Sequence, residues 1–73
     1  MIEMFQPVVS LVDVPALGIK AGVQGCVIDI YDTPYPGFEV EFFDAEGETI
    51  GFTSMRPEEI SAMPPKRPAL LAA

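Results

Sequence analysis

The segment that most restricts the fold of this chain is Phe38-Glu39-Val40-Glu41-Phe42, in which apolar and acidic residues alternate strictly. Successive side chains of a β-strand point to opposite faces, so this alternation is typical of a half-buried antiparallel strand. It predicts that Phe38, Val40 and Phe42 lie in a hydrophobic core. It also predicts that Glu39 and Glu41 face solvent.

Three further strands are predicted from β-branched and apolar runs, at residues 5–12, 23–32 and 49–53. In the second of these, we expect Cys26, Ile28 and Ile30 to share the core face and Asp29 to project from the other.

The segments between the predicted strands carry the residues of loops and turns. An irregular loop is expected at 13–22 and turns at 33–37 and 44–48, where Gly47 can take a positive φ. Pro57, followed by two acidic residues, predicts one short 3-10 or α turn near the C-terminus.

These segments fit one domain over residues 1–62, followed by a Pro-rich tail over 63–73 that we expect to be extended and flexible. The first residues of the tail can add a short closing strand. Short strands with frequent turn signals predict an all-β fold. Because closure removes exposed strand edges, we expect a small barrel of about five antiparallel strands.

The charge of the chain is strongly negative, with eleven acidic residues against four basic ones among 73 residues and a formal net charge of −7. Seven of the acids fall between positions 29 and 48, where no basic residue occurs: Asp29, Asp32, Glu39, Glu41, Asp44, Glu46 and Glu48. Such a field repels phosphate, so the sequence argues against nucleic acid as a partner.

Cellular location follows from the cysteine count and from apolar run lengths. Cys26 is the only cysteine, which excludes an internal disulfide and a multi-thiolate metal site and makes a reducing cytoplasm the expected compartment. No apolar run reaches the roughly 18 residues of a membrane span, and the first residues lack the pattern of a secretion signal. We therefore expect a soluble protein with no membrane partner.

The glycine-rich stretch Gly18-Ile19-Lys20-Ala21-Gly22-Val23-Gln24-Gly25-Cys26-Val27-Ile28-Asp29-Ile30-Tyr31 resembles the KOW-type β-loop-β element. Together with the strands at 38–42 and 49–52, the chain is similar over about residues 5–62 to a family of small bacterial proteins of unknown function with an SH3-like barrel. The resemblance implies the fold and assigns no activity. Nucleic-acid-binding KOW domains are usually basic in the glycine loop, whereas Lys20 is the only charge there.

No catalytic, cofactor or metal site is predicted. The chain has no histidine to activate Cys26, which we expect to be a buried, inert thiol. The carboxylate pairs Glu39 with Glu41 and Glu46 with Glu48 are interpreted as solvated faces. The acids around Gly47 loosely resemble a calcium loop, but the segment is too short for that pattern and is interpreted as an acidic turn.

Aromatic residues within the acidic region predict a contact surface for a protein partner. The alternative is that Tyr31, Tyr35 and Phe43 fold back as lids on the core. The candidate partner-binding residues are Tyr31, Tyr35, Glu39, Glu41, Phe43, Asp44 and Glu46. A basic protein or a second copy of this chain suits such a surface.

Two functions follow from this surface. The first is a non-catalytic protein-interaction module. The second is an antitoxin-like or immunity-like inhibitor, or an accessory subunit, that neutralises a basic partner protein.

The end of the chain, Leu71-Ala72-Ala73, resembles the end of the tag that bacteria add to stalled translation products. AAA+ proteases recognise that tag through its small apolar end, so the resemblance implies a short-lived protein. The alternatives are that the chain ends this way by chance, or that the tail packs against a second subunit.

Overall fold

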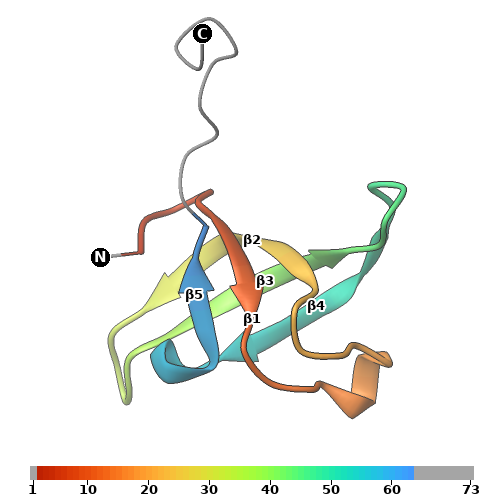
Figure 1. Ribbon diagram of the computed structural model, residues 1–73. Coiled ribbons are helices and arrows are strands. Elements are labelled where there is room, and N and C mark those ends of the chain that lie inside the picture. The colour runs from red at the N-terminus through yellow and green to blue at the C-terminus, as the bar shows by residue number, and fades with distance from the viewer. Residues whose placement is uncertain (1, 64–73) are drawn as a thin grey trace, which may run out of the picture.

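The structure is a computed structural model and describes residues 2–63. The predicted flexibility of the tail and its degradation signal concern residues 64–73, which lie outside this range. The described residues form five strands and two single 3-10 turns (Figure 1). In chain order these are β1 (Pro7–Ser10), η1 (Pro15–Leu17), β2 (Gln24–Tyr31), β3 (Gly37–Phe43), β4 (Thr49–Met55), η2 (Pro57–Glu59) and β5 (Ile60–Ala62).

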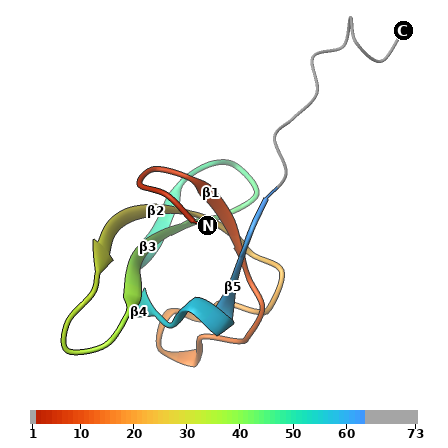
Figure 2. The ribbon, with the colours of Figure 1, turned by 90° about the vertical axis from the view of Figure 1, so that its left-hand side faces the viewer.

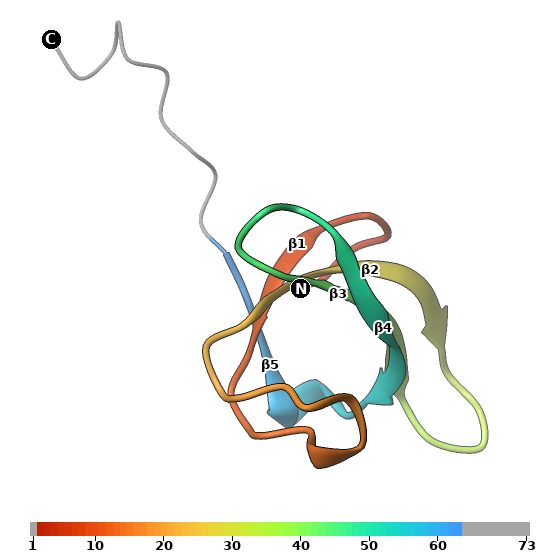
Figure 3. The same cartoon turned by 90° about the vertical axis from the view of Figure 1, so that its right-hand side faces the viewer.

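The five strands form one antiparallel sheet in the order β4-β3-β2-β1-β5, so the all-β prediction is confirmed. Seen end on, the sheet curls around a common interior, and the segment that contains η2 joins β4 to β5 (Figures 2 and 3). Within the described residues β4 and β5 do not pair with each other. The predicted closure of the barrel is therefore corrected to a curled, open sheet with two edges.

The hydrophobic core lies inside this curl. Its buried side chains come from every strand and from the loop after η1: Val8, Ile19, Val27, Val40, Phe42, Met55 and Ile60. Val40 and Phe42 are fully buried, and Phe38 is half-buried and packs against the cluster. The alternation that predicted the core side of β3 is thus confirmed.

The predicted core face of β2 was wrong. Val27 pairs with Val40 and is fully buried, whereas Cys26 pairs with Glu41 and is half-buried on the opposite side. The register shifts between Val27 and Asp29, and Ile30 is exposed. A bulge changes the phase of side-chain alternation along a strand, and the apolar run Cys26-Val27-Ile28 gives no polarity signal that would reveal the change.

The turn predicted at Pro57 is present as η2, and β5 follows it directly. The backbone N–H of Arg56 donates to the Glu59 carboxylate at 2.9 Å, and the N–H of Glu59 donates to the Arg56 carbonyl at 2.9 Å. Proline fixes the φ of the first residue and lacks the N–H that would have no partner there, which favours this start. The other turn, η1, was not predicted, because Pro15 is not followed by the acidic residues that follow Pro57.

Residues 2–63 contain no helix that is long and apolar enough to cross a membrane.

Candidate functional site

The outer side of strands β2, β3 and β4 brings together polar and aromatic residues from all three. Across this side, Asp29 of β2 lies opposite Glu39 of β3, which lies opposite Ser54 of β4. In the next row, Cys26 lies opposite Glu41, which lies opposite Phe52. We call these six residues and Tyr31 the outer face.

Hydroxyl groups hold both glutamates of the outer face in place. Tyr31 Oη and Ser54 Oγ donate to Glu39 Oε1 at 3.1 and 2.8 Å, and Thr49 Oγ1 donates to Glu41 Oε2 at 2.6 Å. Each set of hydrogen bonds uses one oxygen of its carboxylate. The other oxygen of each accepts no side-chain hydrogen bond from the described part of the chain and remains available to a ligand.

Phe52 is the most exposed aromatic side chain of the outer face, with 55% of its surface accessible, compared with 37% for Tyr31. Sequence reasoning did not identify it as a site residue. A regular hairpin that pairs Phe43 with Thr49 would place Phe52 opposite Val40, on the core side. A register shift between Phe42 and Phe43 places it opposite Glu41 instead.

Gly51, the residue before Phe52, is the sequence signal for this register shift. Gly51 lies opposite Phe42, and Leu17 of η1 packs into the space that a side chain would occupy. A Cβ atom built on Gly51 would lie 2.9 Å from Leu17 Cδ2. A glycine inside an apolar strand often marks a bulge or a close approach.

The outer face shifts the pKa values of its two weaker acids upward. Partial burial raises the pKa of Tyr31, and the hydrogen bond to Glu39 raises it further because both disfavour the phenolate. Burial also raises the pKa of the Cys26 thiol, with a further contribution from the charge of Glu41. Cys26 is half-buried, so the prediction of a buried thiol was wrong. Its raised pKa favours the less reactive thiol form over the thiolate.

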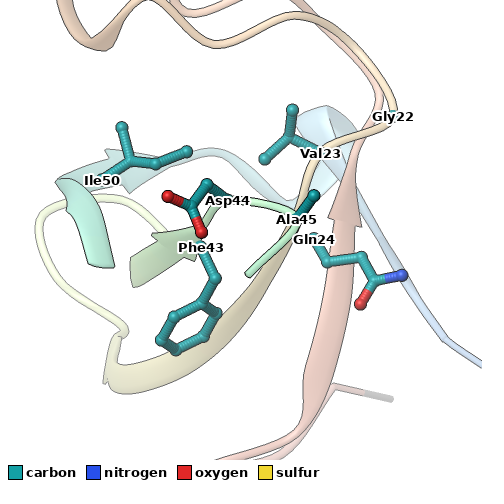
Figure 4. Close-up of a pocket in the computed structure, with 7 residues that line it drawn as sticks. All are labelled: Gly22, Val23, Gln24, Phe43, Asp44, Ala45 and Ile50. Carbon is teal, nitrogen blue, oxygen red and sulfur yellow. The ribbon is translucent and has the colours of Figure 1, made fainter. Parts of the chain in front are cut away.

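Three of the predicted site residues lie at the hairpin between β3 and β4. Phe43 and Asp44 line a shallow hollow of about 440 Å³ with Ile50 and with residues 22–24 (Figure 4). The Asp44 carboxylate accepts the backbone N–H groups of Glu46 and Glu48, both at 2.9 Å, so it shapes the turn. Within residues 2–63, no group of three or more His, Cys, Asp or Glu side chains is placed to hold a metal ion.

Tyr35 lies at the other end of β3, in the loop that joins β2 to β3 (Figure 1). It is 79% exposed and borders a second hollow with Pro36, Arg56, Pro57 and Glu58. The predicted residues therefore occupy three places. Tyr31, Glu39 and Glu41 share the outer face; Phe43, Asp44 and Glu46 lie at the hairpin; and Tyr35 lies apart from both.

Neither the curated proteins nor the solved structures include a significant match to this chain. A family described as "Domain of unknown function (DUF4926)" matches residues 4–62, a range that spans all five strands and both 3-10 turns. The match covers most of the 73 residues. The chain therefore belongs to this family of uncharacterised domains.

Proposed function

We propose that this protein is a non-catalytic interaction module that binds a basic protein through the outer face. The observation that carries the proposal is an exposed aromatic ring, Phe52, directly opposite Glu41 on the neighbouring strand. An aromatic surface with an adjacent carboxylate suits a lysine or arginine side chain, because the ring attracts a cation and the carboxylate accepts its hydrogen bonds.

The charge distribution supports a basic partner. The basic residues of the described part are Lys20, in the loop before β2, and Arg56, at the start of η2; neither lies on the outer face. The acids from Asp29 to Glu48 create a negative field that accelerates association with a basic protein.

The composition of the outer face also supports a binding role over a catalytic one. The hydroxyl groups of Tyr31 and Ser54 donate to Glu39 and that of Thr49 donates to Glu41, so both carboxylates are held in place as hydrogen-bond acceptors for a partner. The raised pKa of Cys26 reduces its thiolate fraction, and the chain has no histidine to act as its base.

We infer that the strands have an SH3-like arrangement. We also infer that this is a bacterial protein of the cytoplasm. The inference is supported by a curled sheet in which β1 pairs with both β2 and β5 and a 3-10 turn precedes β5. The glycine-rich, KOW-like stretch and the single free cysteine support it as well.

The second candidate is an immunity-like inhibitor or accessory subunit that neutralises a basic partner. The net charge of −7 on so short a chain favours it, because association between strongly charged partners is fast and favourable at low ionic strength. The two candidates share a surface and differ in whether the partner loses an activity on binding.

Affinity capture from the organism that encodes the protein tests the proposal. The immobilised proteins are the wild type, a face variant with Glu39→Gln, Glu41→Gln and Phe52→Ser, and a charge-matched control with Glu3→Gln and Glu58→Gln. Both control residues are exposed, and neither belongs to the outer face. We expect the wild type and the control to retain the same basic protein and the face variant to lose it.

Retention of that protein by all three immobilised chains would contradict the assignment of the outer face. If the retained protein is an enzyme or toxin whose activity falls on binding, the inhibitor function is supported over the simple module.

A further inference from the structure

We propose that strand β4 is the docking edge of this module, to which an extended segment of a basic protein adds as a sixth, hydrogen-bonded strand. This inference rests on the proposed function and specifies how the partner binds. β4 ends the sheet: in the described part of the chain it pairs with β3 alone. Backbone N–H and C=O groups on its other edge therefore have no strand partner in the described part of the chain, and extended peptides bind to such edges.

From Gly51 to Met55, β4 lacks the features that usually block an exposed edge. Natural edge strands are protected by charged side chains, proline, bulges or very short length. β4 is seven residues long, Thr-Ile-Gly-Phe-Thr-Ser-Met, and contains no charge and no proline. The other edge of the sheet, β5, has only three residues. Of the two edges, β4 is therefore the one that is long enough for a strand to add.

The bulge near the hairpin limits the docking edge to one part of β4. The register shift lies between Phe42 and Phe43, beside the first residues of β4, and a bulge increases the local twist of a strand. From Gly51 to Met55 the pairing with β3 is regular. A partner strand can therefore pair regularly with β4 from Gly51 to Met55.

The side chains around this edge define the chemistry of the occupant. An added strand would lie about 4.8 Å beyond β4 and about 10 Å beyond β3. Ser54 and Thr49 of β4 hydrogen-bond to Glu39 and Glu41, which ties both carboxylates to the edge strand. A lysine or arginine side chain is long enough to cross β4 along Phe52 and reach these carboxylates. The matching segment therefore has basic residues at alternate positions, on the same side of the sheet as the outer face.

Charge also distinguishes this occupant from a second copy of the chain. If two copies paired through their β4 edges, the acidic outer faces of both would join into one continuous surface, and two chains of net charge −7 would come together. Like charges placed across an interface oppose association. A basic strand meets the same edge with complementary charge, so the structure favours it.

The probe for this proposal is the blocked heptapeptide Lys-Val-Lys-Val-Lys-Val-Lys, which is as long as β4. Binding is measured by calorimetry at low salt, and amide hydrogen exchange of the protein is followed by NMR. Two further peptides carry N-methyl groups, one on all lysines and one on all valines. In an added strand, N–H groups of one parity point to the sheet and those of the other to solvent. One methylated peptide should therefore bind at least about tenfold more weakly while the other retains its affinity.

The protein variants separate the edge from the charges. Glu39→Gln with Glu41→Gln should weaken the heptapeptide about fivefold or more, whereas the charge-matched control with Glu3→Gln and Glu58→Gln should change its affinity less than twofold, a distinction expected for pairwise contacts. Exchange should slow at alternate amides of β4 when the heptapeptide is bound.

Three results would overturn the strand-addition proposal. If the peptide binds but both methylated forms bind equally and β4 amides are not protected, strand addition is wrong and the proposed function stands. If no basic peptide binds even at low salt, strand addition and the proposed function are both wrong. If the free protein is already a dimer with protected β4 amides, the occupant is a second copy.

Discussion

Two phenylalanines, Phe42 and Phe52, lie on opposite sides of the same sheet, and comparing them tests the assignment of core and outer face. Phe42 is fully buried, whereas Phe52 is 55% exposed. Phe42→Ala should lower the free energy of unfolding by about 3–5 kcal/mol, because it removes a ring from the core and leaves a cavity. Phe52→Ala should cost about 1 kcal/mol or less.

Chemical denaturation of both variants measures this difference. Equal losses would mean that the register of β4 against β3 differs from the one described here.

The thiol of Cys26 offers a second residue-scale prediction. Burial and the charge of Glu41 both raise its pKa above the ordinary value of 9.0, so the thiolate forms only at higher pH. At pH 8 the thiol should react more slowly with a disulfide reagent than a free cysteine does, and the midpoint of its pH–rate profile should lie above 9.0. Glu41→Gln should move that midpoint down, and Glu48→Gln, in the hairpin turn, should leave it unchanged.

A fast reaction at pH 8 with a midpoint below that of free cysteine would contradict this assignment. Such a result would place a positive group near Cys26.

At the scale of elements, β2 leaves no room for a side chain against β3 at Gly25. A Cβ atom there would lie 2.8 Å from the Glu41 carbonyl oxygen and from Val40 Cγ1, and 2.9 Å from a ring carbon of Phe42. Because one of these atoms belongs to the backbone, Gly25→Ala should force the strands apart and cost about 1–3 kcal/mol. Gln24→Ala, at the exposed neighbouring position, should change the free energy of unfolding by less than about 0.5 kcal/mol. Thermal or chemical unfolding compares the two; an unchanged stability in the Gly25 variant would mean that this contact is looser.

The buried faces of the strands show which features of the fold could be predicted from the sequence and which could not. The alternation in β3 gave its core face correctly, because acidic and apolar residues differ strongly in the cost of burial. The prediction for β2 was wrong, because its residues from Cys26 to Ile28 are all apolar and a bulge then changes the phase. Phe52 was missed for a similar reason, since only the register shift between β3 and β4, which skips Ile50, turns it outward.

The residue types of the candidate site could be predicted from the sequence, but their positions on the surface could not. The region rich in acids and aromatics was visible in the sequence, yet its residues divide among the outer face, the hairpin and the loop that holds Tyr35. β3 alone separates the two ends by about 20 Å, at about 3.3 Å per residue. Residues close in the sequence therefore lie far apart when a strand runs between them.

For the molecule as a whole, the charge of −7 predicts no binding to duplex DNA or single-stranded RNA at physiological salt. Binding to nucleic acid depends on the release of counterions by clustered lysine and arginine side chains, and seven acids between residues 29 and 48 have no basic residue among them. Fluorescence anisotropy with labelled oligonucleotides measures this. A micromolar complex that weakens steeply with added salt would contradict the prediction.

The central claim, that the outer face of β2, β3 and β4 binds a basic protein, is tested most directly by mapping where a basic ligand contacts the protein. The measurement is the change in backbone amide chemical shifts when the blocked Lys-Val heptapeptide is added at low salt, with a Glu-Val heptapeptide as the control. We predict changes concentrated at residues 26–31, 39–41 and 51–55, with none from the acidic peptide. Changes centred on the acidic hairpin at 44–48, or spread evenly over all acidic residues, would contradict the claim.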